Sequence, residues 1–375
     1  MKVLMTGGGT AGHVNPSIAI AETIKNHHPD ATIEFVCSTL PNDKANDLVS
    51  RAGYKLHKVD ICGSYAIWDP RNLKTLYYMV KSNKQARALI EEYCPDVIIG
   101  TGGFACYPVL NAGAEMGIPT LVHESNAIAG KAVKRLAPRV DCVMTNFRST
   151  AEELKGAKRV IRVGNPTVFD LGAVIEKTSR AENGDSKAIE VLSFGGSGGS
   201  EPFNDMVAST LSSIASRMPN VRFYHATGKR DHKRMMDEYY RLDLNKTGNV
   251  EFVEYIYDMH ERMAKADVLI CRAGAMTLSE LALLGKAAIL VPSPYVVYNH
   301  QYKNAKAIYD MGACELVVEV KDKDYKIENP ELTAALERLL SNEAKRVELG
   351  EKIKDFADTD ANDKIYLEIK NLLKM

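Results

Sequence analysis

The sequence predicts an α/β protein of two parallel-sheet domains that face a cleft. Short apolar strand patterns alternate with helical patterns along nearly the whole chain, which is typical of a parallel sheet covered by helices on both faces. The alternation also starts twice with a glycine-rich loop, Gly7 to Gly12 and Gly195 to Gly199. A chain of 375 residues is long for one domain, so two domains are expected.

In the first half, apolar runs predict six strands after the initial one. They lie at 32–37, 55–59, 97–100, 119–122, 140–144 and 159–163. Helices are expected at about 72–93 and at 16–26, the latter with Asn15 as N-cap and Pro16 at the first helical position.

The alternation pauses between residues 164 and 187, where turn-forming and polar residues indicate a linker. It then restarts, with strands expected at 189–194, 221–225, 250–252, 268–270, 287–291 and 314–318, followed by a helical, charged end from 330 to 375. The expected domains are therefore 1–164 and 165–360, with the terminal helix, about 361–375, free to pack back on the first.

Composition excludes several classes of protein. Lys and Arg number 48, as do Asp and Glu, so nothing indicates a nucleic-acid partner. The seven cysteines are scattered without a C-x-x-C pair, which indicates reduced thiols. The first expected strand, Val3 to Met5, follows the first residues at once, so no signal peptide is expected, and no apolar run reaches the length of a membrane-spanning helix. Membrane contact, if present, is expected to be peripheral.

The glycine loops predict anion binding. Each follows a strand and precedes a helix, whose free N–H groups and positive dipole end suit a phosphate. His13 lies where such a ligand would approach, although a capping role would also explain it. Gly7, Gly9 and Gly12 also satisfy G-x-G-x-x-G, and Glu34 follows about twenty residues later, so an NAD-dependent oxidoreductase is an alternative.

The second loop fits G-x-S-x-G around Ser197, the pattern of a hydrolase nucleophile. His225, His232, His260 and His300 could complete a triad, but that fold places its nucleophile in the middle of one sheet. We therefore expect Ser197 to donate a hydrogen bond to a phosphate. A plain strand-to-helix turn is the simpler alternative.

Two polar segments lie at the carboxyl ends of expected strands, where α/β sheets bind ligands. The segment Arg272 to Glu280 opens a helix, and Glu280 could accept hydrogen bonds from two sugar hydroxyls. Capping-box spacing between Thr277 and Glu280 explains the same residues structurally. His123 to Asn126 ends an earlier strand, and N-capping is an equal alternative for it.

A metal signature is nearly absent. Asp358-Thr359-Asp360 is a D-x-D pattern, but it precedes the terminal helix, where N-capping explains it. We expect no obligatory metal and no cofactor. If the ligand carries a diphosphate, we expect helix N-termini to hold it instead of a metal.

Taken in order, these motifs resemble the MurG family of bacterial N-acetylglucosamine transferases. The resemblance covers nearly the whole chain and includes Gly100 to Phe104, Gly164 to Pro166 and Asn299 to Ala305 besides the segments above. It implies the GT-B fold of two Rossmann-like domains, and an inverting, β-1,4-forming transfer from UDP-N-acetylglucosamine to lipid I in peptidoglycan synthesis. It also implies action at the cytoplasmic side of the bacterial cell membrane.

The resemblance also implies roles for individual residues. His13 is the candidate base or leaving-group stabiliser, and Glu124 is a weaker candidate for the base. The donor would contact residues of both domains, namely Thr10, Ala11, Gly12, Asn126, Ser197, Ile256 at the uracil, Ala275, Met276, Thr277, Leu278, Ser279, Glu280 at the ribose and Gln301 at the sugar.

Some positions depart from the family pattern. Phe104, Ser125 and Val168 replace the usual Tyr, Gln and Arg, and the loop from Ser64 to Ile67 lacks the usual positive charge. A transferase that uses a UDP-sugar on another lipid or glycan acceptor therefore stays an alternative, as does a nucleotide-binding module without catalysis. The segment 65–81 combines aromatic, apolar and basic residues and is expected to dock on anionic bilayers. The alternative is that Leu73, Leu76, Tyr77 and Val80 form an apolar stripe that faces the core.

Overall fold

The structure, a computed structural model, describes residues 1–41, 43–61, 72–168, 174, 176, 188–196, 198–326 and 329–375, with the backbone alone for 72–74 and 76. The chain forms two compact units. Unit 1 contains Met1–Val168 and Asp358–Met375, and unit 2 contains Phe169–Ala357. The chain thus passes from unit 1 to unit 2 at 168–169 and returns at 357–358, whereas the sequence placed these boundaries at 164–165 and about 360–361.

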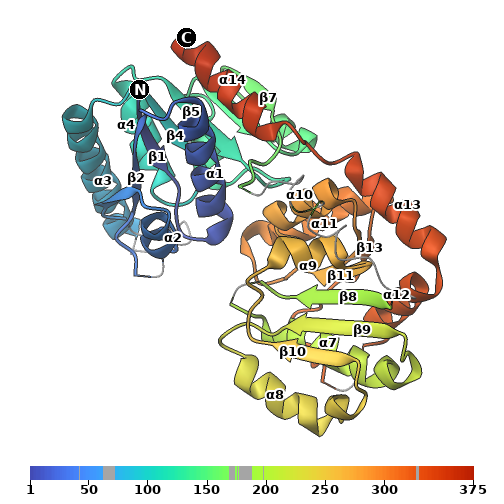
Figure 1. Ribbon diagram of the computed structural model, residues 1–375. Coiled ribbons are helices and arrows are strands. Elements are labelled where there is room, and N and C mark those ends of the chain that lie inside the picture. The colour runs from blue at the N-terminus through green and yellow to red at the C-terminus, as the bar shows by residue number, and fades with distance from the viewer. Residues whose placement is uncertain are drawn as a thin grey trace. The chain divides into compact units, whose positions relative to one another are not determined.

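Unit 1 is built on a seven-stranded parallel sheet in the order β3-β2-β1-β4-β5-β6-β7 (Figure 1). Its strands are β1 Lys2–Thr6, β2 Thr32–Ser38, β3 Lys55–Val59, β4 Val97–Gly100, β5 Thr120–Glu124, β6 Cys142–Thr145 and β7 Val160–Arg162. Its helices are α1 Ala11–His27, α2 Ala45–Arg51, α3 Asn72–Tyr93, α4 Cys106–Glu115, α5 Lys131–Leu136, the 3₁₀ helix η1 Arg148–Glu153 and α14 Ala361–Leu373.

Both faces of this sheet are covered by helices. Successive residues of a strand point to opposite faces, so they pack in different cores. Val3 and Met5 pack in one core with residues of α1, α2 and α14, and Leu4 packs in the other with residues of α3, α4 and α5. The terminal helix α14 contributes Ile365 and Ile369 to the first of these cores. Residues 361–373 therefore belong physically to unit 1.

Unit 2 has a six-stranded parallel sheet in the order β10-β9-β8-β11-β12-β13 (Figure 1). Its strands are β8 Ile189–Phe194, β9 Val221–Ala226, β10 Val250–Val253, β11 Val268–Cys271, β12 Ala287–Leu290 and β13 Glu315–Leu316. Its helices are α7 Glu201–Ile214, α8 His232–Arg241, α9 Met259–Lys265, α10 Ala275–Leu284, α11 His300–Asp310, α12 Pro330–Ser341 and α13 Glu343–Lys354, with 3₁₀ helices η2 Ala215–Arg217, η3 Leu244–Lys246 and η4 Val297–Asn299.

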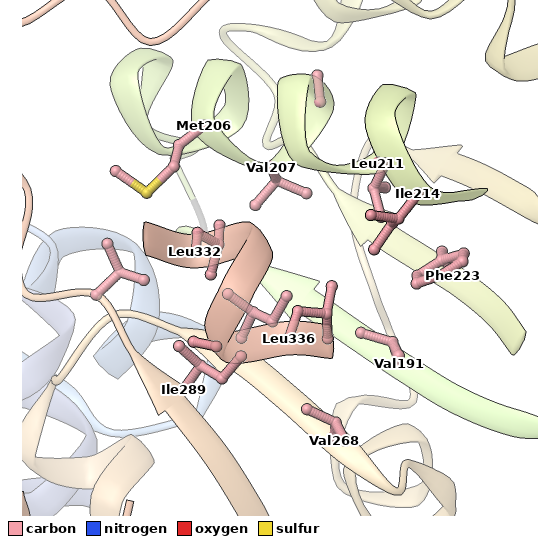
Figure 2. Close-up of a cluster of buried hydrophobic side chains, with 14 of the residues drawn as sticks. Val191, Met206, Val207, Leu211, Ile214, Phe223, Val268, Ile289, Leu332 and Leu336 are labelled. Atoms are coloured by element: carbon pink, nitrogen blue, oxygen red, sulfur yellow. The ribbon is translucent and has the colours of Figure 1, made fainter. Parts of the chain in front are cut away.

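The core of unit 2 lies between its sheet and helices α7 and α12 (Figure 2). Figure 2 shows Leu211 from α7 and Leu336 from α12 directed toward Val191 and Ile289 of the sheet. Helix α12 begins where the chain supplies both signals for a helix start: Pro330 in the first turn, and an asparagine at the N-cap whose side chain accepts a hydrogen bond from the Leu332 N–H at 3.2 Å.

The parallel sheets confirm the fold class predicted from the alternating pattern. The predicted strands occur at nearly the predicted residues, with β13 shorter than expected. None of the described helices combines the length and the apolar character that a bilayer crossing requires.

Candidate functional site

In each unit the strand order reverses at one strand, and the loops around that point form a candidate site within that unit. In unit 1, β1 lies between β2 and β4, with Thr6 level with Gly100. In unit 2, β8 lies between β9 and β11, with Phe194 level with Cys271. Open α/β sheets bind ligands at this switch point, outside the carboxyl ends of the strands.

The first glycine loop leads into α1 five residues earlier than predicted. Thr10 is the N-cap and α1 begins at Ala11, so the expected start at Pro16 with Asn15 as cap is wrong. The N–H groups of His13 and Val14 both bond to the Thr10 carbonyl and close the first turn. Pro16 lacks the N–H that would bond to the carbonyl four residues before it, but the helix continues through it. His13 therefore lies within the first helical turn.

His13 is fixed by the loop that follows β4. The Thr101 hydroxyl donates a hydrogen bond to the His13 carbonyl at 2.6 Å, and the Thr10 hydroxyl lies 3.3 Å from Nδ1. Gly102 has φ +97°, and a side-chain carbon there would lie 2.8 Å from the His13 ring. Only glycine suits this position, because it combines a positive φ with contact against the ring. The half-buried imidazole thus lies at the switch point, with Thr10 and Gly12 exposed beside it.

Asp43 is a site residue that the sequence interpretation missed. It is buried in the loop before α2, and its carboxylate accepts hydrogen bonds from the Gly9 N–H at 2.7 Å, the Ala45 N–H at 3.0 Å and the Ser38 hydroxyl at 2.6 Å. Gly8 is packed against the same carboxylate. Asp43 therefore holds the first glycine loop in place. An aspartate shortly before a helix looks like an ordinary cap, so the sequence gives no distinct signal for this role.

Glu124 is buried at the end of β5, with both carboxylate oxygens engaged. Oε1 accepts from the Asn126 backbone N–H at 3.0 Å and from its side-chain amide at 3.1 Å, and Oε2 accepts from the Gly130 N–H at 2.8 Å. Asn126 is half-buried, and its carbonyl accepts from the Thr150 hydroxyl at 2.9 Å. These bonds shape the loop that follows β5.

His123 is the second buried group at this strand end. Its Nε2 lies 2.8 Å from the Gly164 carbonyl, which can only accept, so Nε2 carries the proton of the neutral ring. The Ser125 hydroxyl lies 3.4 Å from Nδ1. Complete burial lowers the pKa of His123 to about 4, and the bond to the Gly164 carbonyl opposes the shift. His123 thus joins the loop after β5 to the turn that follows β7.

The glycine loop of unit 2 packs on the turn after β9. A side-chain carbon at Gly199 would lie 2.2 Å from the Thr227 carbonyl, and Gly199 itself has φ +74°. Ser200 is the N-cap of α7 but its side chain makes no cap hydrogen bond. Ser197, the predicted phosphate donor and the nucleophile of the hydrolase alternative, lies outside the described residues.

Helix α10 starts at the other switch-point loop of unit 2. Gly274 is the N-cap and the helix begins before Thr277, so the alternative that Thr277 and Glu280 form a capping box is wrong. Ala275, Met276 and Thr277 form the first turn, and glycine offers no side chain to cap their N–H groups. Two residues predicted to contact the donor, Leu278 and Ser279, form hydrogen bonds within the helix itself. The Leu278 N–H bonds to the Gly274 carbonyl with its side chain fully buried, and the Ser279 hydroxyl donates to the Ala275 carbonyl at 3.3 Å.

Glu280 lies one turn into α10, paired with a histidine from α9. Its Oε1 is 3.4 Å from Nε2 of His260, and both side chains are half-buried, at 21% and 32% exposure. The sequence interpretation named His260 only as one of several spare histidines. The pairing depends on how α9 packs on α10, which no local pattern reveals. His260 is therefore a neighbour that can orient the carboxylate.

The two remaining predicted donor contacts lie in separate loops of unit 2. Ile256 follows β10 and its side chain is buried, at 3% exposure. Gln301 is in the first turn of α11, and its side-chain carbonyl accepts from the Ser293 N–H at 2.9 Å. The preceding Tyr298 and Asn299 both have positive φ, at 57° and 53°, an arrangement that non-glycine residues rarely adopt.

The D-x-D pattern does not cap the terminal helix as expected. Asp360 occupies the N-cap position of α14 without a side-chain cap bond, and instead lies 2.9 Å from Lys364 Nζ. Asp358 pairs with Lys364 and lies 3.3 Å from Arg162. Ion pairing with these cations outweighs capping here. Within the described ranges, no group of three or more His, Cys, Asp or Glu side chains is arranged to hold a metal ion.

Glu34, the ribose ligand of the oxidoreductase alternative, is in the wrong place for that role. It lies near the start of β2, four residues or about 13 Å before Ser38, where the strand ends. Its carboxylate pairs with His57 at 2.5 Å and with Lys55 at 3.1 Å, and these contacts lower its pKa. A dinucleotide ribose would bind at the other end of the strand, so the geometry of β2 argues against NAD.

Comparisons with known proteins give the family. Residues 3–145 match the glycosyltransferase family 28 N-terminal domain, and residues 190–365 match the C-terminal domain of the same family. A transferase of Acetivibrio thermocellus is 37% identical, with 100% of this chain and 99% of that protein aligned. One of Caldanaerobacter subterraneus subsp. tengcongensis is also 37% identical, over 99% and 100%. Both are named UDP-N-acetylglucosamine–N-acetylmuramyl-(pentapeptide) pyrophosphoryl-undecaprenol N-acetylglucosamine transferase.

Solved structures agree on the fold. The crystal structure of Acinetobacter baumannii MurG superposes with a TM-score of 0.76 at 24% identity, covering 100% of this chain and 99% of that one. A UDP-GlcNAc 2-epimerase from Neisseria meningitidis, bound to UDP-GlcNAc, gives 0.67 at 14% identity and covers both chains fully. One fold therefore serves different reactions, and the full-length relatives decide between them: the chain belongs to the MurG family of glycosyltransferases.

Proposed function

We propose that the protein transfers N-acetylglucosamine from UDP-N-acetylglucosamine to a polyprenyl-diphosphate-linked N-acetylmuramoyl-pentapeptide, lipid I, and so forms lipid II. The observation that carries the proposal is the pair of helix N-termini at the switch point of unit 2, together with the names of relatives that align along the whole chain. In neither helix does the N-cap side chain form a cap hydrogen bond, and the positive dipole end of each helix favours an anion such as a diphosphate.

In this proposal the donor nucleotide binds unit 2. The first turns of α7 and α10 hold the diphosphate, which needs no metal because their N–H groups and dipoles supply the positive potential. Glu280 accepts hydrogen bonds from the ribose hydroxyls and His260 orients its carboxylate. Ile256 contacts the uracil and Gln301 the sugar. The contact of Gln301 with Ser293 supports its part, because it fixes the side chain beside the start of α11.

The chemical step is a displacement at the anomeric carbon. The acceptor hydroxyl oxygen bonds to that carbon as a base removes its proton, and the bond to the diphosphate oxygen breaks with its electron pair leaving on UDP. Attack from the opposite face inverts the configuration and gives the β-1,4 linkage. The helix N-termini stabilise the negative charge that develops on the leaving diphosphate.

We propose His13 as the base. Its ring is half-buried, its orientation is set by Gly102 and Thr10, and an imidazole is the commonest general base in enzymes. Glu124 is a poorer candidate, because three N–H donors already occupy its two oxygens and would have to be released before it could take a proton. Its contacts fit a role in shaping the loop of Asn126.

We also propose that the protein docks peripherally on the cytoplasmic face of the membrane, where a polyprenyl acceptor remains anchored. Within the described part of the segment 65–81, Tyr77, Met79 and Val80 of α3 expose 62%, 40% and 53% of their surface. Lys81 follows them in the sequence and pairs with Asp60 at 2.7 Å. Trp68 and the loop from Ser64 to Ile67 lie outside the described residues. Aromatic and basic residues together favour an anionic interface.

A transfer assay tests the proposal. Purified protein is incubated with UDP-N-acetylglucosamine and lipid I in detergent micelles, and the glycolipid product and released UDP are quantified. Equal amounts of both are expected. A parallel reaction with other polyprenyl-linked sugars separates this acceptor from the alternative ones. Release of UDP only with a different acceptor would move the assignment to that acceptor, and failure to bind UDP would refute it.

A further inference from the structure

One arginine in unit 2 is buried next to the starts of α7 and α10, the helices proposed to hold the diphosphate. Arg272 directly follows β11, and its side chain is 8% exposed. Nη2 donates to the Ser200 hydroxyl at 2.5 Å, and Nη1 donates to the Val291 carbonyl at 3.0 Å. Nη1 also pairs with the Glu319 carboxylate. One guanidinium thus joins the start of α7 and the residues after β11 and β12 with the segment after β13.

The contact with Ser200 lies at the N-cap of α7. A serine at the N-cap normally accepts from the N–H two or three residues later. Here the Ser200 hydroxyl is used by Arg272 instead, and no cap bond forms. Arg272 is also close to the start of α10 along the chain, because the N-cap of that helix, Gly274, lies two residues after it. The same residue therefore fixes the starts of both helices.

Further contacts hold the guanidinium in place. Its carbon lies 5.0 Å from the centre of the Phe203 ring, on the first turn of α7, and a planar cation stacks well on an aromatic face. Glu319, fully buried, supplies the compensating charge. Asn304 of α11 holds the same loop from the other side, with its amide donating to the Ala273 carbonyl at 3.2 Å.

We infer that Arg272 is a positioning residue that sets the spacing between the N-termini of α7 and α10, so that one diphosphate is held by both helices at once. The inference rests on the proposed function and goes beyond it, because it assigns diphosphate selectivity to a buried side chain. Lysine cannot replace it, because a single ammonium lacks the fork that reaches Ser200 and Val291 together.

The test separates positioning from folding. Replacing Arg272 alone would leave Glu319 as an unpaired buried charge and destabilise unit 2, whereas replacing both partners by neutral residues of similar size often does not. The main variant is therefore the double substitution Arg272→Met with Glu319→Gln. A milder one, Ser200→Ala, removes only the hydroxyl on α7. Arg338→Met is the matched control: it breaks another arginine–glutamate pair of unit 2, with Glu315 at 2.8 Å, on α12.

Binding of UDP is measured by calorimetry, binding of uridine by competition, and folding by the thermal midpoint. The double variant should keep a cooperative transition, bind uridine like wild type, and bind UDP about tenfold or more weakly, because the two helix N-termini are no longer held at the spacing of one diphosphate. Ser200→Ala should shift UDP binding in the same direction, and Arg338→Met should change neither ligand.

Equal loss of UDP and uridine binding in the double variant would mean that Arg272 only maintains the fold, and unchanged UDP binding would exclude a positioning role. In both cases the wild-type transfer assay still stands. A wild-type protein that binds no UDP would instead overturn both this inference and the proposed function.

Discussion

Acidification is expected to weaken unit 1 through one buried imidazole. His123 is completely buried, and its pKa is lowered from 6.5 to about 4. The unfolded chain therefore binds a proton more readily than the folded one between these values. The stabilisation is fully present above pH 6.5 and is lost as the pH falls toward 4. For these two pKa values, the loss between neutral pH and pH 5 is about 2 kcal/mol.

The perturbation is His123→Gln, whose side-chain amide can still donate to the Gly164 carbonyl but cannot be protonated. Unit 2 supplies an internal control, because His225 is also completely buried with a pKa lowered to about 4. Hydrogen exchange followed by mass spectrometry measures protection separately in peptides from β4 and β5 and in peptides from β8 and β9. Rates are corrected for intrinsic exchange at each pH.

Wild-type protein should lose about 2 kcal/mol of protection in the cores of both units between about pH 7.5 and pH 5. In His123→Gln the pH dependence of unit 1 should shrink by that amount, and that of unit 2 should stay. Asp358, whose pKa is raised mainly by burial, also belongs to unit 1 but is common to both proteins, so its contribution cancels in the difference. Identical pH dependence in variant and wild type would refute the reasoning.

The other predictions concern the proposed site. His13→Ala should lower turnover about 10²- to 10⁴-fold while UDP affinity stays within a few-fold, and near-normal transfer would show that the imidazole is structural. Glu280→Ala should weaken UDP binding about tenfold or more in calorimetry, and equal affinity would leave it no role at the ribose. Asp43→Asn should cost about 2 kcal/mol of stability, because one oxygen cannot replace a carboxylate that accepts from three residues; an unchanged denaturation midpoint would contradict this. Tyr77→Ser with Val80→Ser should reduce flotation with anionic vesicles, and equal flotation would place the docking surface elsewhere.

Local patterns in the sequence predicted the strands and most helices, because buried parallel strands are continuous apolar runs and glycine marks the turns that follow them. They placed the start of α1 too late, because proline is typical of a first helical turn, whereas Pro16 lies inside the helix that begins at Ala11. They also missed what depends on packing between distant segments. Asp43 reaches back to the first glycine loop, His260 meets Glu280 across two helices, and Arg272 meets Glu319 forty-seven residues later. The spacing of residues along the sequence does not predict such contacts.

The return of the chain to unit 1 has a consequence for the order of folding during synthesis. Unit 2 is one continuous stretch, but the core of unit 1 is incomplete until Ile365 and Ile369 of α14 have been made. The two crossing segments are then joined on unit 1 by a reciprocal pair of hydrogen bonds, from the Thr167 N–H to the Asn362 side chain at 3.1 Å and back to the Thr167 carbonyl at 2.8 Å. The unit that begins first on the ribosome therefore finishes last, and a chaperone that shields its open face until then would protect the nascent chain from aggregation.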